Sequence, residues 1–154
     1  MLFEKKSEIS EKSDVKMING FVKFQSVRLN VYCFEVDGVL IDTGAASLLE
    51  EFKPFFNTMD VDQVMLTHYH EDHTGGAHFL QTAYNLPIFM NETRIEECKY
   101  KANYPLYRKL FWGARKPFEA QPLENNFTSR TGRWKVIPTP GHTNDHSSFL
   151  NEVT

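Results

Sequence analysis

The apolar run VDQVML is followed at once by THYHEDHTGG, and this junction constrains the chain more than any other feature. Three histidines and two acidic residues occupy the six positions from His68 to His73. Acidic side chains avoid burial unless they are paired, so such a cluster needs a compensating interaction. Gly75 and Gly76 permit tight backbone geometry directly after it. The junction therefore predicts a buried strand that ends in a polar functional turn.

Composition limits the class of protein. The 154 residues suggest one domain, and 41% hydrophobic with 24% charged residues is typical of a soluble globular chain. The net charge of -3 argues against a nucleic-acid binder, and no apolar run approaches the ~20 residues that span a bilayer. Charges begin at Glu4, which leaves no room for a signal-peptide core, and two cysteines are too few for a disulfide framework. We therefore expect a cytoplasmic protein with no membrane partner.

The order of predicted elements indicates a layered domain. Residues 1–16 form a polar lead-in with four acids and four lysines, and residues 17–154 form the domain. Short β-type runs begin at Gly20, and the Asp37-Gly38 pair predicts a hairpin. A helix is expected over residues 45–56, after which strands and helices alternate. This order favours an α/β or α+β fold with helices covering sheet faces.

The cluster itself has the composition of a metal site. His68 and His70 point the same way if they extend the strand, because side chains alternate along it. Asp72 and His73 follow on the turn. Imidazole and carboxylate together suit zinc, iron or manganese, held as one ion or two. A polar turn with surface histidines is the alternative, and three histidines in six positions argue against it.

A second segment, PTPGHTNDHSS, offers a distant partner. We interpret His142, held after a rigid Pro-x-Pro-Gly turn, as a ligand that closes the first site. His146 is expected to support the site without binding the metal, and His78 to pack. Asp42, after a buried strand, has two compatible roles: it caps a turn, or it accepts a hydrogen bond from a ligand histidine and fixes its orientation.

Residues 99–116 bear on the substrate. They contain six basic residues and no acid, with aromatic residues at helical spacing. One interpretation is a helix that packs its aromatic stripe on the sheet. The other is a lid over the metal that favours an anionic or acyl-chain substrate. The candidates for lining such a pocket are Tyr104, Tyr107, Phe111 and Trp112. A nucleic-acid surface is a third option, which the acidic net charge disfavours.

Three segments together resemble one family. THYHEDHTGG is similar to the His-x-His-x-Asp-His signature of the metallo-β-lactamase superfamily, VLIDTGA to its early strand and turn, and PTPGHTNDHSS to its third-histidine segment. The resemblance covers roughly residues 20–150. It implies an αββα sandwich with the metals at one edge. Members include glyoxalase II, lactonases, β-lactamases, ribonuclease Z, persulfide dioxygenases and flavodiiron proteins.

The resemblance also implies roles for residues. His68, His70 and His142 would hold the first metal, Asp72 and His73 would contribute to a second, and Asp42 would support them. The expected function is a hydrolase in which a metal-bound hydroxide attacks an ester, thioester, amide or phosphoester of a small molecule, with Asp72 as the catalytic carboxylate. Zinc is the first choice of metal, with iron or manganese as alternatives. The alternative functions are an iron-dependent oxygenase or electron-transfer module, and an inactive truncated domain with a binding or structural role.

One departure from the family pattern matters. Members supply a later bridging aspartate and a final histidine, whereas this chain offers only Glu152 after His146. The C-terminal part of the sandwich is therefore expected to be missing from the chain as given. This predicts exposed sheet edges and exposed apolar surface unless a partner, or a second copy in an oligomer, covers them.

Overall fold

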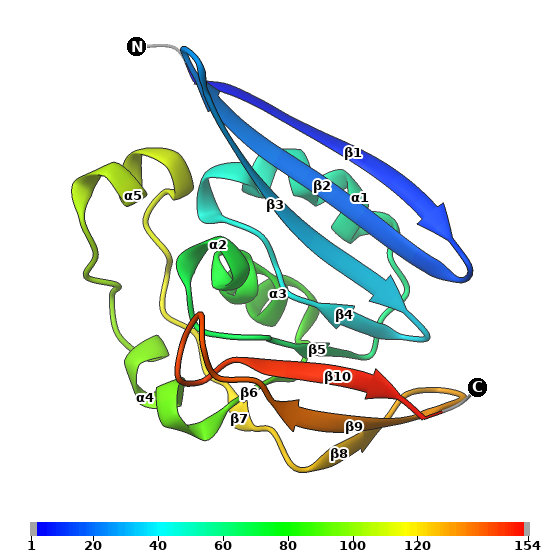
Figure 1. The fold of residues 1–154 in the computed structure, drawn as a ribbon. Helices are drawn as coiled ribbons and strands as arrows, with labels where there is room; N and C mark the ends of the chain where they lie inside the picture. Colours follow the sequence, from blue (N-terminus) through cyan, green and yellow to red (C-terminus); the bar gives the residue numbers. More distant parts are fainter. Residues whose placement is uncertain (1–2, 153–154) are drawn as a thin grey trace.

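The computed structural model of the chain describes residues 3–152, and its strands form two sheets (Figure 1). The larger sheet has seven strands in sequence order. Neighbouring strands from β1 to β4 pair in antiparallel fashion, and neighbouring strands from β4 to β7 pair in parallel. Its strands are β1 (Glu4–Lys12), β2 (Val15–Phe24), β3 (Val27–Val36), β4 (Val39–Ile41), β5 (Gln63–Met65), β6 (Ile88–Met90) and β7 (Gln121–Pro122). The smaller antiparallel sheet has the order β10–β9–β8, from β8 (Asn126–Thr128), β9 (Arg133–Pro138) and β10 (Ser147–Asn151).

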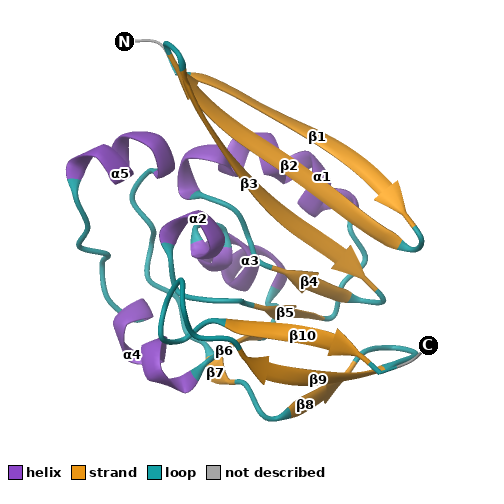
Figure 2. Ribbon diagram, in the orientation of Figure 1, coloured by secondary structure: helices purple, strands orange, loops and turns teal. Residues whose placement is uncertain are grey.

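Short helices fill the connections between the parallel strands (Figure 2). They are η1 (Ala46–Leu48), α1 (Leu49–Thr58), α2 (Glu71–Thr74), α3 (Ala77–Tyr84), η2 (Glu92–Arg94), α4 (Ile95–Cys98) and α5 (Leu106–Trp112). The helix expected over residues 45–56 is therefore present, divided into η1 and α1. None of the helices within residues 3–152 combines the length and the apolar character that crossing a membrane would require.

The core lies between the helices and one face of the larger sheet. Ile18 of β2 pairs with Cys33 of β3. Both side chains are fully buried, because alternate residues of each strand point to this face. Val64 of β5 belongs to the same cluster, whereas Met65 points to the opposite face and borders the smaller sheet. Helices, large sheet and small sheet are thus stacked in layers, and the mixed α/β fold expected from the sequence is confirmed.

The polar segment at the start of the chain is a strand, which the sequence analysis did not predict. All nine residues of β1 pair with β2, from Glu4 with Lys23 to Lys12 with Val15. Eight of the nine are exposed, as the composition suggested. The segment has no hydrophobic face to reveal a strand, because its order comes from the backbone of β2. Charged side chains are also what protects the edge of a sheet from pairing with another chain.

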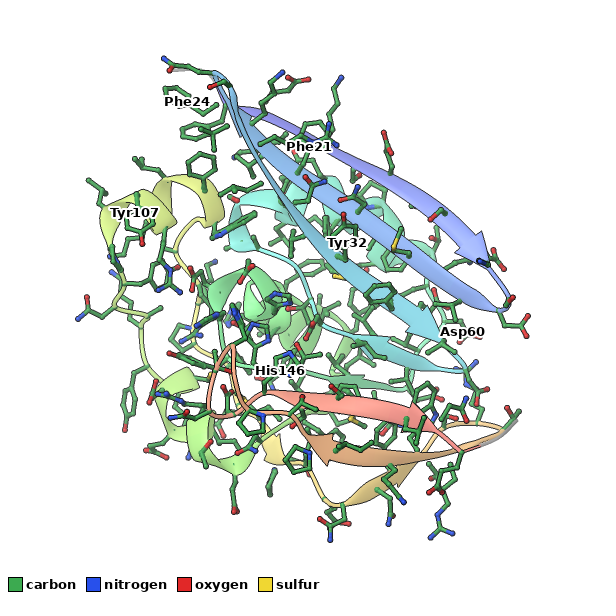
Figure 3. The ribbon with its side chains drawn as sticks, viewed as in Figure 1. Phe21, Phe24, Tyr32, Asp60, Tyr107 and His146 are labelled. Atoms are coloured by element: carbon green, nitrogen blue, oxygen red, sulfur yellow. The ribbon has the colours of Figure 1, made fainter. Side chains whose placement is uncertain are left out.

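Apolar side chains are exposed at both ends of the fold, as expected. Ile9 is 56% exposed on β1, and Leu150 is 52% exposed on β10. Tyr32 of β3 is 40% exposed and lies on the outer face of the larger sheet (Figure 3). Within the described residues, the strands with only one neighbour are β1, β7, β8 and β10.

Phe52 is the side chain on which the core packing converges. Its ring occupies space that two glycines leave open: a Cβ on Gly20 would lie 2.4 Å from one ring atom, and a Cβ on Gly44 would lie 2.5 Å from another. Gly44 also has a positive φ of 74°. Helix α1 can therefore approach the sheet closely only because these two positions lack side chains.

We expect Phe52→Ala to lower the free energy of unfolding by about 3–5 kcal/mol, because it removes buried apolar surface and leaves a cavity. Equilibrium denaturation in urea would measure the change. Leu150→Ala, on the exposed edge strand, is the control and should change the free energy by less than about 1 kcal/mol. Equal losses for the two variants would contradict the assignment of the core.

Candidate metal centre

The histidine cluster lies at the carboxyl ends of the parallel strands. His68 and His70 are on the extended segment that leaves β5, and Asp72 and His73 are on helix α2. Asp42 follows the neighbouring strand β4. Since β4 and β5 are parallel, their carboxyl ends meet at one edge of the sheet and bring these side chains together.

Two glycines let this turn approach the loop after β4. A Cβ on Gly75 would lie 2.2 Å from the backbone nitrogen of Ala46, and one on Gly76 would lie 2.4 Å from the carbonyl oxygen of Thr43. The amide of Gly75 donates to the carbonyl of Gly44 at 2.8 Å. The sequence predicted tight geometry here, and the structure shows that a neighbouring backbone imposes it.

His68, His70 and His142 form the first group of potential ligands. One ring nitrogen from each lies within 4.8 Å of the others. Nδ1 of His70 is 3.2 Å from Nε2 of His142, two positions that are 72 residues apart in the chain. Nε2 of His68 is buried without a hydrogen-bond partner in the described structure. A buried nitrogen lone pair facing two other imidazoles is a donor set that fits a divalent cation.

His68, Asp72 and His73 form a second group, also within 4.8 Å. Oδ2 of Asp72 is 3.4 Å from Nε2 of His73, and the rings of His68 and His73 are 4.2 Å apart. His68 therefore belongs to both groups. The structure brings together all five positions that the sequence analysis named as ligands.

Asp42 contacts the second group through the imidazole of His73. Its Oδ2 is 2.9 Å from Nδ1 of His73 and accepts a hydrogen bond from the hydroxyl of Thr67 at 2.8 Å. Its Oδ1 accepts a hydrogen bond from the amide of Thr67, also at 2.8 Å. Its carboxylate is buried, and its backbone has a positive φ of 63°. If Nδ1 of His73 donates to Asp42, Nε2 is left as the atom that can bind a metal. The predicted contact of Asp42 with a histidine is present, whereas its carboxylate caps neither η1 nor α1, because its partners are Thr67 and His73.

His146 and His78 lie where they can support structure. His146 directly precedes β10 (Figure 3). Its ring centroid is 5.1 Å from that of His68, and its Nδ1 is 2.8 Å from the hydroxyl oxygen of Thr139. The next residue, Ser147, donates its amide to the carbonyl of Thr67 at 2.8 Å, which ties the His142 loop to the motif. Nδ1 of His78 is 2.9 Å from the carbonyl oxygen of Pro117, away from both groups.

The histidines differ in their readiness to release a proton. Burial, together with the nearby His73 and His70, lowers the pKa of His68 to about 3. Burial and the charge of Arg108 lower the pKa of His70. Burial alone would lower the pKa of His73, but its hydrogen bonds to Asp42 and Asp72 raise it to about 10. His68 and His70 are thus neutral and ready to bind a metal, whereas a metal at His73 must displace a proton.

In the basic, aromatic segment of residues 99–116, some aromatic side chains pack on the core and others line a cleft. Trp112 is buried and Phe111 packs edge-on against Phe3, as the packing alternative predicted. Tyr107 is 66% exposed on the outer side of α5 (Figure 3). Of the four pocket candidates only Tyr104 lines a cleft beside the motif.

The sequence analysis missed an ion pair between this segment and the motif. The guanidinium of Arg108 donates two hydrogen bonds to the carboxylate of Glu71, which is 4% exposed. An acid between two ligand histidines, and a basic segment without acids, were the available signals. Only the fold shows that they meet.

Comparison with known proteins agrees with this geometry. The family model for the metallo-beta-lactamase superfamily matches residues 28–153. The chain belongs to the metallo-beta-lactamase superfamily. The resemblance noted in the sequence is thereby confirmed, and the β1 strand lies before the matched region.

Two members of the superfamily show how far the sequence of this chain has diverged from its relatives. The chain is 26% identical over 116 residues to a hydroxyacylglutathione hydrolase of Bdellovibrio bacteriovorus, covering 74% of this chain and 39% of that protein. It is 29% identical over 119 residues to a hydroxyacylglutathione hydrolase of Pectobacterium atrosepticum, covering 73% of this chain and 38% of that protein. The chain thus spans well under half the length of these superfamily relatives.

Solved structures share the superfamily fold. The metallo-beta-lactamase GOB-18 from Elizabethkingia meningoseptica superposes with a TM-score of 0.61 at 20% identity, over 80% of this chain and 49% of that one. A metallo-beta-lactamase from Cronobacter sakazakii gives a TM-score of 0.63 at 13% identity, over 94% of this chain and 58% of that one. At these identities the likeness concerns the fold.

The raised pKa of His73 predicts how pH acts on the metal-free chain. Because the pKa is about 10 in the folded state against an ordinary 6.5, protonated His73 stabilises the fold fully below about 6.5. That contribution is lost as the pH rises through about 10. We expect the difference in unfolding free energy between the chain and His73→Gln, both with chelator, to be larger near pH 6 than near pH 10. A difference that stays constant or grows would contradict the assigned hydrogen bonds.

Proposed function

We propose that this chain forms the metal-binding part of a hydrolase that acts on an ester, thioester, amide or phosphoester of a small molecule. The observation that carries the proposal is the pair of adjacent ligand groups sharing His68 at the carboxyl edge of the sheet. Superfamily membership supports hydrolysis, since the relatives in the comparison are named as hydrolases. Their names also favour an acyl substrate, and hydrolysis over the iron-dependent alternatives.

The residues fit one or two divalent metals, with zinc as our first choice. His68, His70 and His142 would hold one ion, because neutral imidazoles are good zinc ligands. Asp72 and His73 would contribute to a second. When bound, the metal would lower the pKa of a water molecule toward neutrality and supply the attacking hydroxide.

Asp72 has the properties of the catalytic carboxylate. Burial raises its pKa, but the hydrogen bond and charge of His73 outweigh burial, and the net pKa lies below its ordinary value. Asp72 therefore stays ionised and can accept a hydrogen bond from the attacking water. Asp42 holds His73, and through it the position of Asp72, by the contacts described above. The cytoplasmic location and the oligomeric state stay predictions.

Removing one exposed ligand tests the proposal with little risk to folding. We expect His142→Ala to weaken zinc binding at least tenfold and to abolish hydrolysis of a panel of ester, thioester and phosphoester substrates. Metal analysis and chelator competition measure the first effect. His78→Ala, a histidine outside both groups, is the matched control. Unchanged metal content and turnover in His142→Ala would overturn the proposal.

Asp42 provides a second test. We expect Asp42→Asn to weaken metal binding about 10–100-fold, because the amide cannot accept from His73 as the carboxylate does. Chelator competition again measures the affinity. Asp60→Asn, at an exposed acid that pairs with Arg130 and belongs to neither ligand group, should leave the affinity unchanged. An equal loss in both variants would mean that Asp42 acts on overall charge alone.

A further inference from the structure

A cleft of about 320 Å³ lies beside the metal centre, between the motif and the basic segment. Its lining includes three tyrosines and three basic residues, namely Tyr69, Tyr100, Lys101, Tyr104, Arg108 and Arg115. Its volume is at the lower end of the range for small-molecule sites, so it can hold one portion of a substrate.

The cleft is one side chain away from the ligands. Tyr69, which lines it, stands between His68 and His70 in sequence, and its ring centroid is 4.9 Å from that of His70. On the other side, Arg108 also lines the cleft and is bonded to Glu71, the residue that follows His70. A molecule held at the metal can therefore reach into the cleft past the Tyr69 ring.

Buried hydrogen bonds fix the walls of the cleft. Arg108 pairs with the buried carboxylate of Glu71 through two hydrogen bonds. Arg115 is 6% exposed and donates from Nη1 to the carbonyl of Tyr69 at 2.9 Å, and its amide donates to the hydroxyl oxygen of Tyr104 at 3.0 Å. Arg108, Arg115 and Tyr104 are thus positioned before any ligand arrives, which lowers the entropic cost of binding.

The cleft has one exposed cation in its lining that no carboxylate of the described residues neutralises. Its cations are Lys101, Arg108 and Arg115, and its anions are Glu71 and Glu97. Glu71 neutralises Arg108, while Glu97 is also bonded to Arg94 outside the lining. Lys101 is exposed, and no ion pair within residues 3–152 engages it. An exposed ammonium at the rim is the group that a ligand can pair with at least cost in desolvation.

We propose that this cleft binds the non-reacting end of the substrate, and that this end is a carboxylate carried on an apolar or aromatic body. A single exposed cation without a carboxylate partner matches a monoanion better than a phosphate dianion. The rings of Tyr69, Tyr100 and Tyr104 supply apolar faces for the body, and Lys101 pairs with the carboxylate. The inference rests on the proposed function, since it names the substrate class of the same site.

Binding of a matched pair of probes tests this without turnover or metal. N-acetylphenylalaninate and its neutral amide differ only in the charged group. We expect the metal-free chain to bind the carboxylate about three- to fivefold more tightly, as a partly exposed charge pair allows, in NMR titrations that follow the tyrosine signals. Lys101→Gln should remove the preference and Lys101→Glu should reverse it. Lys116→Gln, in the same basic segment but lining a different hollow, should keep it.

The outcomes separate this inference from the proposed function. Equal binding of both probes, or loss of the preference in Lys116→Gln, would overturn the cleft assignment whatever the metal content. If the hydrolase activity is also found, Lys101→Glu should raise KM for a carboxylate-bearing ester with kcat unchanged. A metal-free, inactive chain that still prefers the carboxylate would support the cleft and contradict the hydrolase.

Discussion

The metal centre depends on the hydrogen bonds that the buried carboxylate of Asp42 makes. This carboxylate joins the end of β4 to the segment that leaves β5, because it accepts from both the amide and the hydroxyl of Thr67. It also holds the imidazole of His73. An unpaired buried carboxylate would be strongly unfavourable, so these three bonds specify one arrangement of the two loops. The absence of side chains at Gly75 and Gly76 permits that arrangement.

Folding concentrates polar groups at this edge, and their pKa values reflect it. His68 is kept neutral by burial beside other imidazoles, while His73 is kept protonated by two carboxylates. The fold therefore holds both an imidazole nitrogen with no hydrogen-bond partner and a displaceable proton within a few ångströms. A divalent cation would relieve the repulsion among the imidazoles and replace the proton, which is the physical reason for expecting a metal here.

Local signals carried much of the prediction, and they failed where order comes from a partner. The ligands in THYHEDH could be named because their spacing lies within a few residues of one strand end. β1 could not, since its residues have no hydrophobic alternation and pair only through the backbone of β2. Phe111 and Trp112 were pocket candidates that belong to the packing, because helical spacing alone does not tell which face of α5 meets the core.

The sequence by itself determined the chemistry: which side chains could bind a metal, and that they follow buried strands. Only the tertiary structure decided which side chains lie next to one another at the site. It brought His142 to within 3.2 Å of His70 across 72 positions, and it joined Arg108 to Glu71. Such contacts depend on parallel strand pairing and on loop closure, which are set by the whole sheet and not by any local pattern. For that reason the ligands were readable in the sequence, and the cleft beside them was not.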